Sequence, residues 1–111
     1  MTVEITTNRV GTTAIVTPHG DIDLVTSPEF RTAVHAAIDA GAGAMVIDLS
    51  DSEFLDSTAL GVLVSVHRRL GDWVVVTGTR PAVLRLFEIT RFSTVLRLYA
   101  SVEEGLAALK D

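Results

Sequence analysis

Apolar and polar residues alternate near the start of the chain in the way that is typical of β-strands. Residues 3–7 and 13–17 are rich in Val, Ile and Thr, and a short segment containing Gly11 separates the two runs. This pattern predicts an antiparallel hairpin. Pro18 has no backbone N–H to donate, so we expect it at the end or on the open side of the second strand.

From Thr26 onward the apolar residues recur at helical spacing instead. Thr26 and Ser27 carry hydroxyl groups suited to a helix cap, Pro28 suits the first turn, and Glu29 lies three residues after Thr26. Gly41 is placed to end the helix, which we expect to run to about residue 40. Its buried stripe is expected to consist of Phe30, Val34, Ala37 and Ile38.

The middle of the chain contains two apolar segments of different kinds. Residues 44–49 form a short apolar run that ends in polar residues, which predicts a central strand buried on both faces. Residues 56–58 offer capping side chains ahead of residues 59–67, which are apolar on nearly all sides for two helical turns. We therefore expect a strand followed by a well-buried helix.

The last third of the chain repeats this alternation. Residues 73–77 predict an interior strand, Pro81 opens a helix through about residue 88, and residues 95–99 predict a shorter strand. A final helix begins at Ser101, which has capping-box spacing to Glu104. The stripe expected to dock this helix on the sheet consists of Val102, Leu106 and Leu109.

The order of the expected elements is ββαβαβαβα, without a linker or an internal repeat. Strand–helix alternation of this kind predicts the α/β fold class. We expect a single domain, residues 1–111, built on a mixed sheet of about five strands faced by about four helices.

Composition narrows the cellular setting. The 111 residues suffice for one hydrophobic core but not for two, and 48% of them are apolar. There is no cysteine, which excludes disulfides, thiolate metal sites and cysteine nucleophiles. The amino terminus lacks the basic segment and long apolar run of a signal peptide, and no apolar run approaches the roughly 20 residues needed to cross a bilayer. We therefore expect a cytoplasmic protein without a membrane span.

The charge distribution points to protein partners rather than nucleic acid. The formal net charge is −5, whereas nucleic-acid binding relies on clustered Lys and Arg. Between residues 21 and 56 the single base Arg31 accompanies eight acids, namely Asp21, Asp23, Glu29, Asp39, Asp48, Asp51, Glu53 and Asp56. If these acids share a face, they would attract a partner with a basic patch, and the alternative is a solvated acidic surface without a partner.

One segment carries a specific motif. Residues 48–61 run from the end of a predicted strand, through a loop with Phe54, to Asp-Ser-Thr-Ala-Leu-Gly at a predicted helix start. This segment closely resembles the signature of the STAS domain family, named for sulfate transporters and anti-sigma factor antagonists. Gly-Asp-Ile-Asp at residues 20–23 and Arg-Pro-Ala-Val-Leu-Arg-Leu-Phe at residues 80–87 also resemble segments of that family. The resemblance covers essentially the whole chain.

The resemblance implies a regulatory site at the start of the second helix. In antagonists of the family, the serine after the motif aspartate is phosphorylated by a serine-kinase anti-sigma factor, and that serine is Ser57 here, with Thr58 as the second candidate. Ala59 replaces the usual glycine, and its methyl group is expected to narrow the approach of a partner. The partner-binding residues implied are Asp21, Asp23, Asp56, Ser57, Thr58, Leu60 and Gly61.

Other functions receive less support from the residues. Ser57 and Thr58 alone would be interpreted as helix caps, and both roles can coexist. His19, His35 and His67 are the only histidines, and none belongs to a catalytic motif; His35 is expected at a surface position. The loop aspartates do not follow a calcium-loop pattern, and no phosphate-binding glycine loop is present. We expect no enzyme activity, no catalytic or metal-binding residue and no cofactor.

The leading hypothesis is therefore an anti-sigma factor antagonist. Unphosphorylated protein would bind a serine-kinase anti-sigma factor and free a sigma factor, and phosphorylation of Ser57 would reverse this. A phosphatase is a further partner that this hypothesis implies. The alternative is a STAS subunit that does not switch and docks on a transporter or a larger regulatory assembly, with Ser57 as a cap only.

Overall fold

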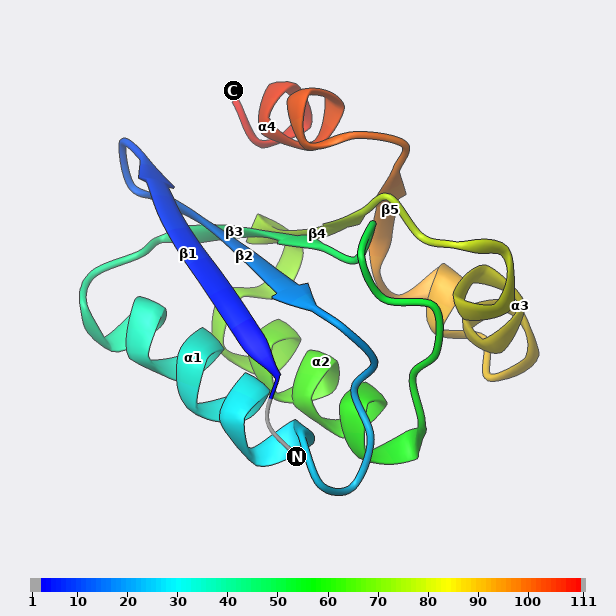
Figure 1. Ribbon diagram of the computed structural model, residues 1–111. Coiled ribbons are helices and arrows are strands. Elements are labelled where there is room, and N and C mark those ends of the chain that lie inside the picture. Colours follow the sequence, from blue (N-terminus) through cyan, green and yellow to red (C-terminus); the bar gives the residue numbers. More distant parts are fainter. Residues whose placement is uncertain (1–2, 111) are drawn as a thin grey trace.

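A computed structural model describes residues 3–110 of the chain. Its elements follow the expected order (Figure 1). They are β1 (Glu4–Val10), β2 (Thr13–His19), α1 (Ser27–Asp39), β3 (Ala44–Asp48), α2 (Ser57–Leu70), η1 (Gly71–Trp73), β4 (Val74–Thr77), α3 (Pro81–Ile89), η2 (Phe92–Thr94), β5 (Arg97–Tyr99) and α4 (Val102–Leu109). The predicted α/β class and element order are therefore confirmed.

The strands form one mixed sheet in the order β1-β2-β3-β4-β5. β1 and β2 are antiparallel and joined by a two-residue turn, in which Gly11 has a φ of 61° that favours glycine. The pairs β2–β3, β3–β4 and β4–β5 are parallel. Because parallel strands end at the same edge of a sheet, the loops after β2 and β3 emerge side by side.

Helices cover the two faces of the sheet unequally. α1 and α2 lie against one face, and α4 lies against the other (Figure 1). The main core lies between the sheet and the α1–α2 layer and includes Phe30, Leu63 and Met45. A smaller core forms where Leu109 of α4 packs on alternate residues of β3 and β4. β3 is thus buried on both faces, as its apolar run predicts.

Several boundaries differ from the expectation. β1 extends through Val10, because the hairpin turn is shorter than the polar segment suggests. Trp73 lies in the short helix η1 rather than in β4, and Val95 precedes β5. In α4 the Ser101 side chain accepts the backbone N–H of Glu104, as predicted, but the Glu104 carboxylate accepts the N–H of Ala100 rather than that of Ser101.

Candidate functional site

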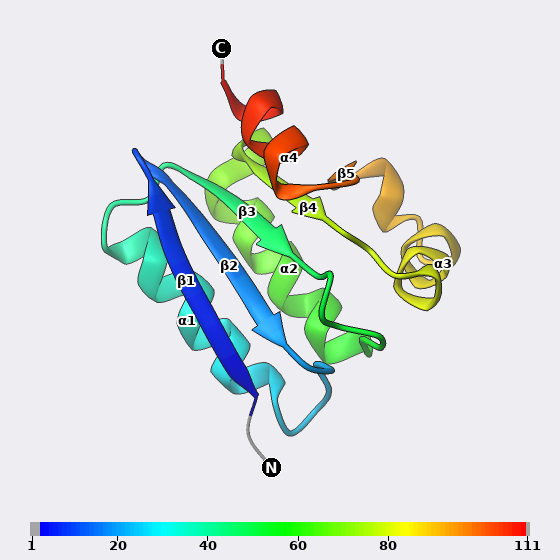
Figure 2. The same ribbon diagram turned by 45° about the horizontal axis from the view of Figure 1, so that its top comes forward.

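The loop after β2 and the loop after β3 are joined by backbone hydrogen bonds. The N–H of Ile22 donates to the carbonyl oxygen of Phe54 at 3.2 Å. The N–H of Asp56 donates to the carbonyl oxygen of Ile22, also at 3.2 Å. Ile22 and Leu55 form an isolated parallel bridge, and both side chains are buried. Residues 20–26 and 50–57 therefore form one surface at the start of α1 and α2 (Figure 2).

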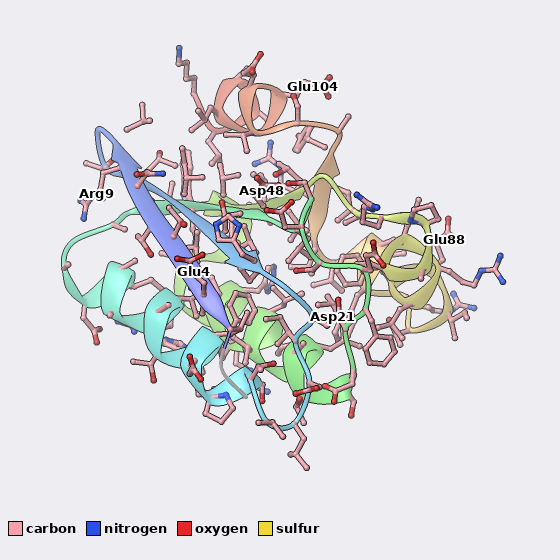
Figure 3. All side chains as sticks on the ribbon, viewed as in Figure 1. Glu4, Arg9, Asp21, Asp48, Glu88 and Glu104 are labelled. Atoms are coloured by element: carbon pink, nitrogen blue, oxygen red, sulfur yellow. The ribbon has the colours of Figure 1, made fainter. Side chains whose placement is uncertain are left out.

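Asp21 strengthens this junction. It lies where the two loops meet (Figure 3), and its Oδ1 accepts the N–H groups of Glu53 and Phe54 at 3.0 and 3.1 Å. The hydroxyl of the buried residue Ser52 donates to the carbonyl oxygen of Gly20 at 2.8 Å. Asp21, expected as a partner-binding residue, thus organises the loops of the surface.

Asp23 caps the turn that leads into α1. Its Oδ1 accepts the N–H groups of Val25 and Thr26 at 2.9 and 3.1 Å, and its carbonyl oxygen accepts the N–H of Ser27 at 2.8 Å. The Thr26 hydroxyl oxygen in turn accepts the N–H of Asp23 at 2.9 Å. Thr26 is the N-cap position of α1 and Pro28 lies in its first turn, as predicted, but the Thr26 side chain makes no capping hydrogen bond to the helix. Its hydroxyl bonds to Asp23 instead, so the reciprocal pair is Asp23–Thr26 rather than Thr26–Glu29.

Asp56 caps α2 in the same way. Its carboxylate accepts the N–H groups of Thr58 and Ala59 at 2.9 and 3.3 Å and also the hydroxyl of Thr58. The hydrogen bond from the Thr58 hydroxyl is the main cause that lowers the pKa of Asp56, and the N–H groups of Ala59, Thr58 and Leu24 add to it against the opposing effect of burial. The carboxylate is therefore held in its charged form beside both loops.

Ser57 is exposed at the first position of α2. Within residues 3–110 its hydroxyl makes no hydrogen bond, because the cap is Asp56 and the hydroxyl that supports the cap belongs to Thr58. The interpretation of Ser57 as a side-chain cap therefore does not fit this geometry. Its Oγ is open to solvent, whereas the half-buried Thr58 hydroxyl is committed to Asp56.

The next residues of α2 divide between the core and the surface. Ala59 and Leu60 are buried in the main core, and Gly61 is exposed with open space where a Cβ would stand. The expectation that the Ala59 methyl group narrows a partner's approach is therefore wrong, since the methyl group points inward. Leu60, expected to bind a partner, supports the surface from beneath instead.

Three exposed apolar side chains at this surface were not predicted. Leu24 is 72% exposed, Val25 60% and Phe54 53%. Leu24 and Val25 are consecutive, and they occupy the turn that Asp23 caps. An apolar pair between a strand end and a helix start is a weak sequence signal, because only the tertiary structure shows that nothing covers it.

The hydrogen bonds of His19 and His35 do not involve Ser57. His35, expected at the surface, is half-buried, and its Nε2 lies 2.8 Å from the Ser65 hydroxyl. Arg69 donates to Nδ1 of the ring at 3.1 Å, so Nε2 carries the proton and donates to Ser65. Because Ser65 itself donates to a backbone carbonyl, the ring cannot serve as its base. His19 bridges Thr6 and Asp51.

Acidic groups dominate the surface around Ser57. Asp51, Glu53 and Asp21 are exposed beside the half-buried Asp23 and Asp56. Arg80, which directly precedes α3, approaches Glu53 at 3.4 Å, an exposed contact of small energetic value. Among residues 3–110 no group of three or more His, Asp or Glu side chains is arranged to hold a metal ion, and none of the helices described is long and apolar enough to cross a membrane.

Comparison with known proteins gives a consistent match. A sequence profile described as the STAS domain matches residues 4–105. The anti-sigma-B factor antagonist of Listeria monocytogenes is 32% identical over 82 residues, which cover 71% of this chain and 72% of that protein. The anti-sigma-F factor antagonist RsfB of Mycobacterium tuberculosis is 26% identical over 99 residues, covering 87% and 81% of the two chains.

A solved structure agrees over nearly the full length. The crystal structure of an anti-sigma factor antagonist from Mycobacterium paratuberculosis superposes with a TM-score of 0.90 at 30% identity, covering 98% of this chain and 95% of that one. The overall fold thus has a counterpart of known structure.

Proposed function

Because this chain belongs to the STAS domain family, we propose that it is an anti-sigma factor antagonist that is switched off by phosphorylation of Ser57. The unphosphorylated protein binds an anti-sigma factor with serine kinase activity and so frees a sigma factor. A phosphatase restores the active form. The protein acts by binding rather than by catalysis.

The observation that carries this proposal is the free hydroxyl of Ser57. A kinase needs an exposed acceptor oxygen, and Ser57 is exposed at the first position of α2 without a hydrogen bond to residues 3–110. Thr58 would have to give up its bond to Asp56 before it could react. This difference favours Ser57 as the acceptor, and it favours a switch over the alternative in which Ser57 is a structural cap of a docked subunit.

The fold is expected to tolerate a phosphate at this position. Phosphorylation adds about −1.5 to −2 charges. The amino-terminal end of a helix favours an anion by roughly 0.3 to 1 kcal/mol, through the helix dipole and the free backbone N–H groups. Because the Ser57 side chain faces solvent, its phosphate can remain hydrated. Modification should therefore leave the structure of the protein intact.

A bound partner would not tolerate the same phosphate. Asp56 is adjacent to Ser57, and the joined loops add Asp21 and Asp23 to the same surface. A partner that covers Ser57 would bury an added dianion next to these carboxylates, and an unpaired buried charge costs several kcal/mol. Since about 1.4 kcal/mol is a tenfold change in affinity, part of this cost is enough to release the partner.

The test is to incubate the protein with ATP and each purified anti-sigma factor of its source organism, and to locate the phosphate by mass spectrometry. We expect one phosphate, on Ser57, and loss of binding once it is present. Ser57→Ala should abolish labelling while binding persists, and Ser57→Glu should abolish binding.

Two matched variants control for the position of the hydroxyl. Thr58→Val removes the neighbouring hydroxyl, and Ser65→Ala removes a serine hydroxyl in the middle of the same helix, which donates to the carbonyl oxygen of Val62. Both should still be labelled at Ser57. Labelling that survives Ser57→Ala would contradict the assignment of the acceptor, and a failure of every anti-sigma factor to bind would contradict the function itself.

A further inference from the structure

The apolar pair Leu24–Val25 occupies an unusual position. Single exposed apolar residues are common on protein surfaces and need no explanation. Here two consecutive large apolar side chains are 72% and 60% exposed in the turn that leads into α1. The same turn lies against the loop that carries Ser57, through the bridge between Ile22 and Leu55.

Hydrogen bonds hold this turn in place from both sides. The Asp23 carboxylate accepts the N–H of Val25 at 2.9 Å, and the Asp23 carbonyl oxygen accepts the N–H of Ser27 at 2.8 Å. On the other side, the N–H of Leu24 is among the groups that stabilise the charged form of Asp56. These bonds fix the backbone of the turn, so both side chains project from an ordered backbone into solvent.

A fixed apolar pair is well suited to binding. Ordering a mobile segment on association costs free energy, and a preformed contact avoids most of that cost. Interfaces generally draw most of their affinity from a few apolar or aromatic anchors that enter a pocket of the partner. Leu24 and Val25 have the exposure and the ordered backbone that suit such an anchor.

The charge around the pair indicates the chemistry of the partner. Asp23 and Asp56 flank the turn directly, Asp21 precedes it in the same loop, and the adjoining loop adds Asp51 and Glu53. Arg31 is the only base between residues 21 and 56. Because Glu53 lies near Arg80 and Asp51 contacts His19, the acids without a basic partner within residues 3–110 and nearest the pair along the chain are Asp21 and Asp23. A complementary surface therefore has an apolar pocket with Lys or Arg side chains opposite these two carboxylates.

We propose that Leu24 and Val25 form the hydrophobic anchor of the complex, inserting into an apolar pocket with a basic rim on the anti-sigma factor. This inference rests on the proposed function, because it takes the anti-sigma factor as the occupant. It divides the surface into two tasks: the apolar pair supplies affinity, and Ser57 next to it controls whether the partner can stay bound.

The test uses a photo-crosslinking residue, p-benzoyl-phenylalanine, placed singly at three positions of the full chain in its source organism. Position 24 probes the anchor. Position 61 is exposed near Ser57 and has free space, so it reports whether any partner covers the switch surface. Position 89 is the matched control, because Ile89 is 73% exposed at the carboxyl-terminal end of α3.

We expect positions 24 and 61, but not position 89, to crosslink to an anti-sigma factor identified by mass spectrometry. With that anti-sigma factor purified, Leu24→Ala should raise Kd about tenfold or more, while Ile89→Ala should change Kd less than about twofold. The thermal midpoint of Leu24→Ala should match that of the wild-type protein, because the side chain is exposed.

The possible failures are distinguishable. If position 61 crosslinks to the anti-sigma factor while position 24 does not, or if Leu24→Ala leaves Kd unchanged, the anchor is overturned and the proposed function stands. If neither position crosslinks to an anti-sigma factor, both are overturned. Equal crosslinking from positions 24 and 89 would also overturn the anchor.

Discussion

The turn that leads into α1 and the start of α2 are built alike but present different side chains. Asp23 and Asp56 each accept two backbone N–H groups of the following turn, and each is paired with a threonine, Thr26 or Thr58. The residue directly after each aspartate faces solvent: it is Leu24 in the turn before α1 and Ser57 at the start of α2.

The two positions therefore have different roles: one offers a contact to a partner, and the other offers a group that can be modified. A leucine fixed after one aspartate offers an apolar contact that no modification can change. A serine fixed after the other offers a hydroxyl that can gain charge. Because the Ile22–Leu55 bridge joins the two loops, a partner that covers one position must also lie close to the other.

Removing either cap should have the largest effect on stability. Asp56→Ala should lower the free energy of unfolding by about 2 kcal/mol and Asp23→Ala by about 1 kcal/mol, because each leaves backbone N–H groups without an acceptor and Asp56 also holds the Thr58 hydroxyl. Urea denaturation followed by circular dichroism measures both values. Glu29→Ala, an exposed acid in the first turn of α1, is the control and should change stability by less than about 0.5 kcal/mol. Equal small losses at all three positions would show that the caps contribute little.

The two exposed positions should differ in how salt affects their variants. Ser57→Glu weakens partner binding through charge, whereas Leu24→Ala weakens it through lost apolar contact. Raising NaCl from about 0.05 to about 0.5 M should therefore recover part of the affinity lost by Ser57→Glu and little of that lost by Leu24→Ala. Titration calorimetry at the two salt concentrations measures this. The same salt response in both variants would mean that the two positions act through one mechanism.

Acid should weaken the second cap. The pKa of Asp56 is lowered from 3.8, chiefly by the hydrogen bond from Thr58, so the unfolded chain binds this proton more readily than the folded one. The stabilisation is present above that value and is lost as pH falls through the lower pKa of the folded state. The free energy of unfolding, measured by denaturation between about pH 6 and about pH 2, should fall less steeply with decreasing pH for Asp56→Asn than for the wild-type protein. Parallel curves would contradict this role of the carboxylate.

The smallest effect on stability is expected at His35 of α1, which contacts Ser65 and Arg69 of α2. Burial is the main cause that lowers the pKa of His35 from 6.5; Arg69 and Arg31 lower it further, and Asp39 opposes them. The unfolded chain therefore binds the proton more readily, and stability decreases as pH falls below 6.5. Thermal midpoints between about pH 7.5 and 5 should change less in His35→Gln than in the wild-type protein. A steeper change in the variant would contradict a lowered pKa of His35 as the cause of the loss of stability in acid.

Much of the fold could be predicted because its signals are local. The run at β3, the stripe of α4 and the start of α3 at Pro81 each occupy the predicted place. Where prediction was wrong, a tertiary contact overrode the local pattern. Thr26 occupies the N-cap position of α1, but its hydroxyl bonds to Asp23 in the preceding turn instead of capping the helix.

At the candidate site, too, local signals could be predicted and tertiary contacts could not. Ser57 could be predicted from the motif as the residue of interest, whereas the orientation of its neighbours could not. Leu60 and Leu24 are the same residue type, yet Leu60 is buried and Leu24 is exposed. Hydrophobicity alone does not tell which apolar residue of a helix start or turn faces the core.

The sequence by itself determined the order of the elements and the position of Ser57 at a helix start, because apolar periodicity and short motifs act over a few neighbouring residues. Only the tertiary structure decided that Asp23 and Asp56 cap two turns on one surface, and that Leu24 is displayed beside Ser57. These relations depend on contacts between residues about thirty positions apart, such as Ile22 with Leu55, which form only when β2 and β3 pair in parallel.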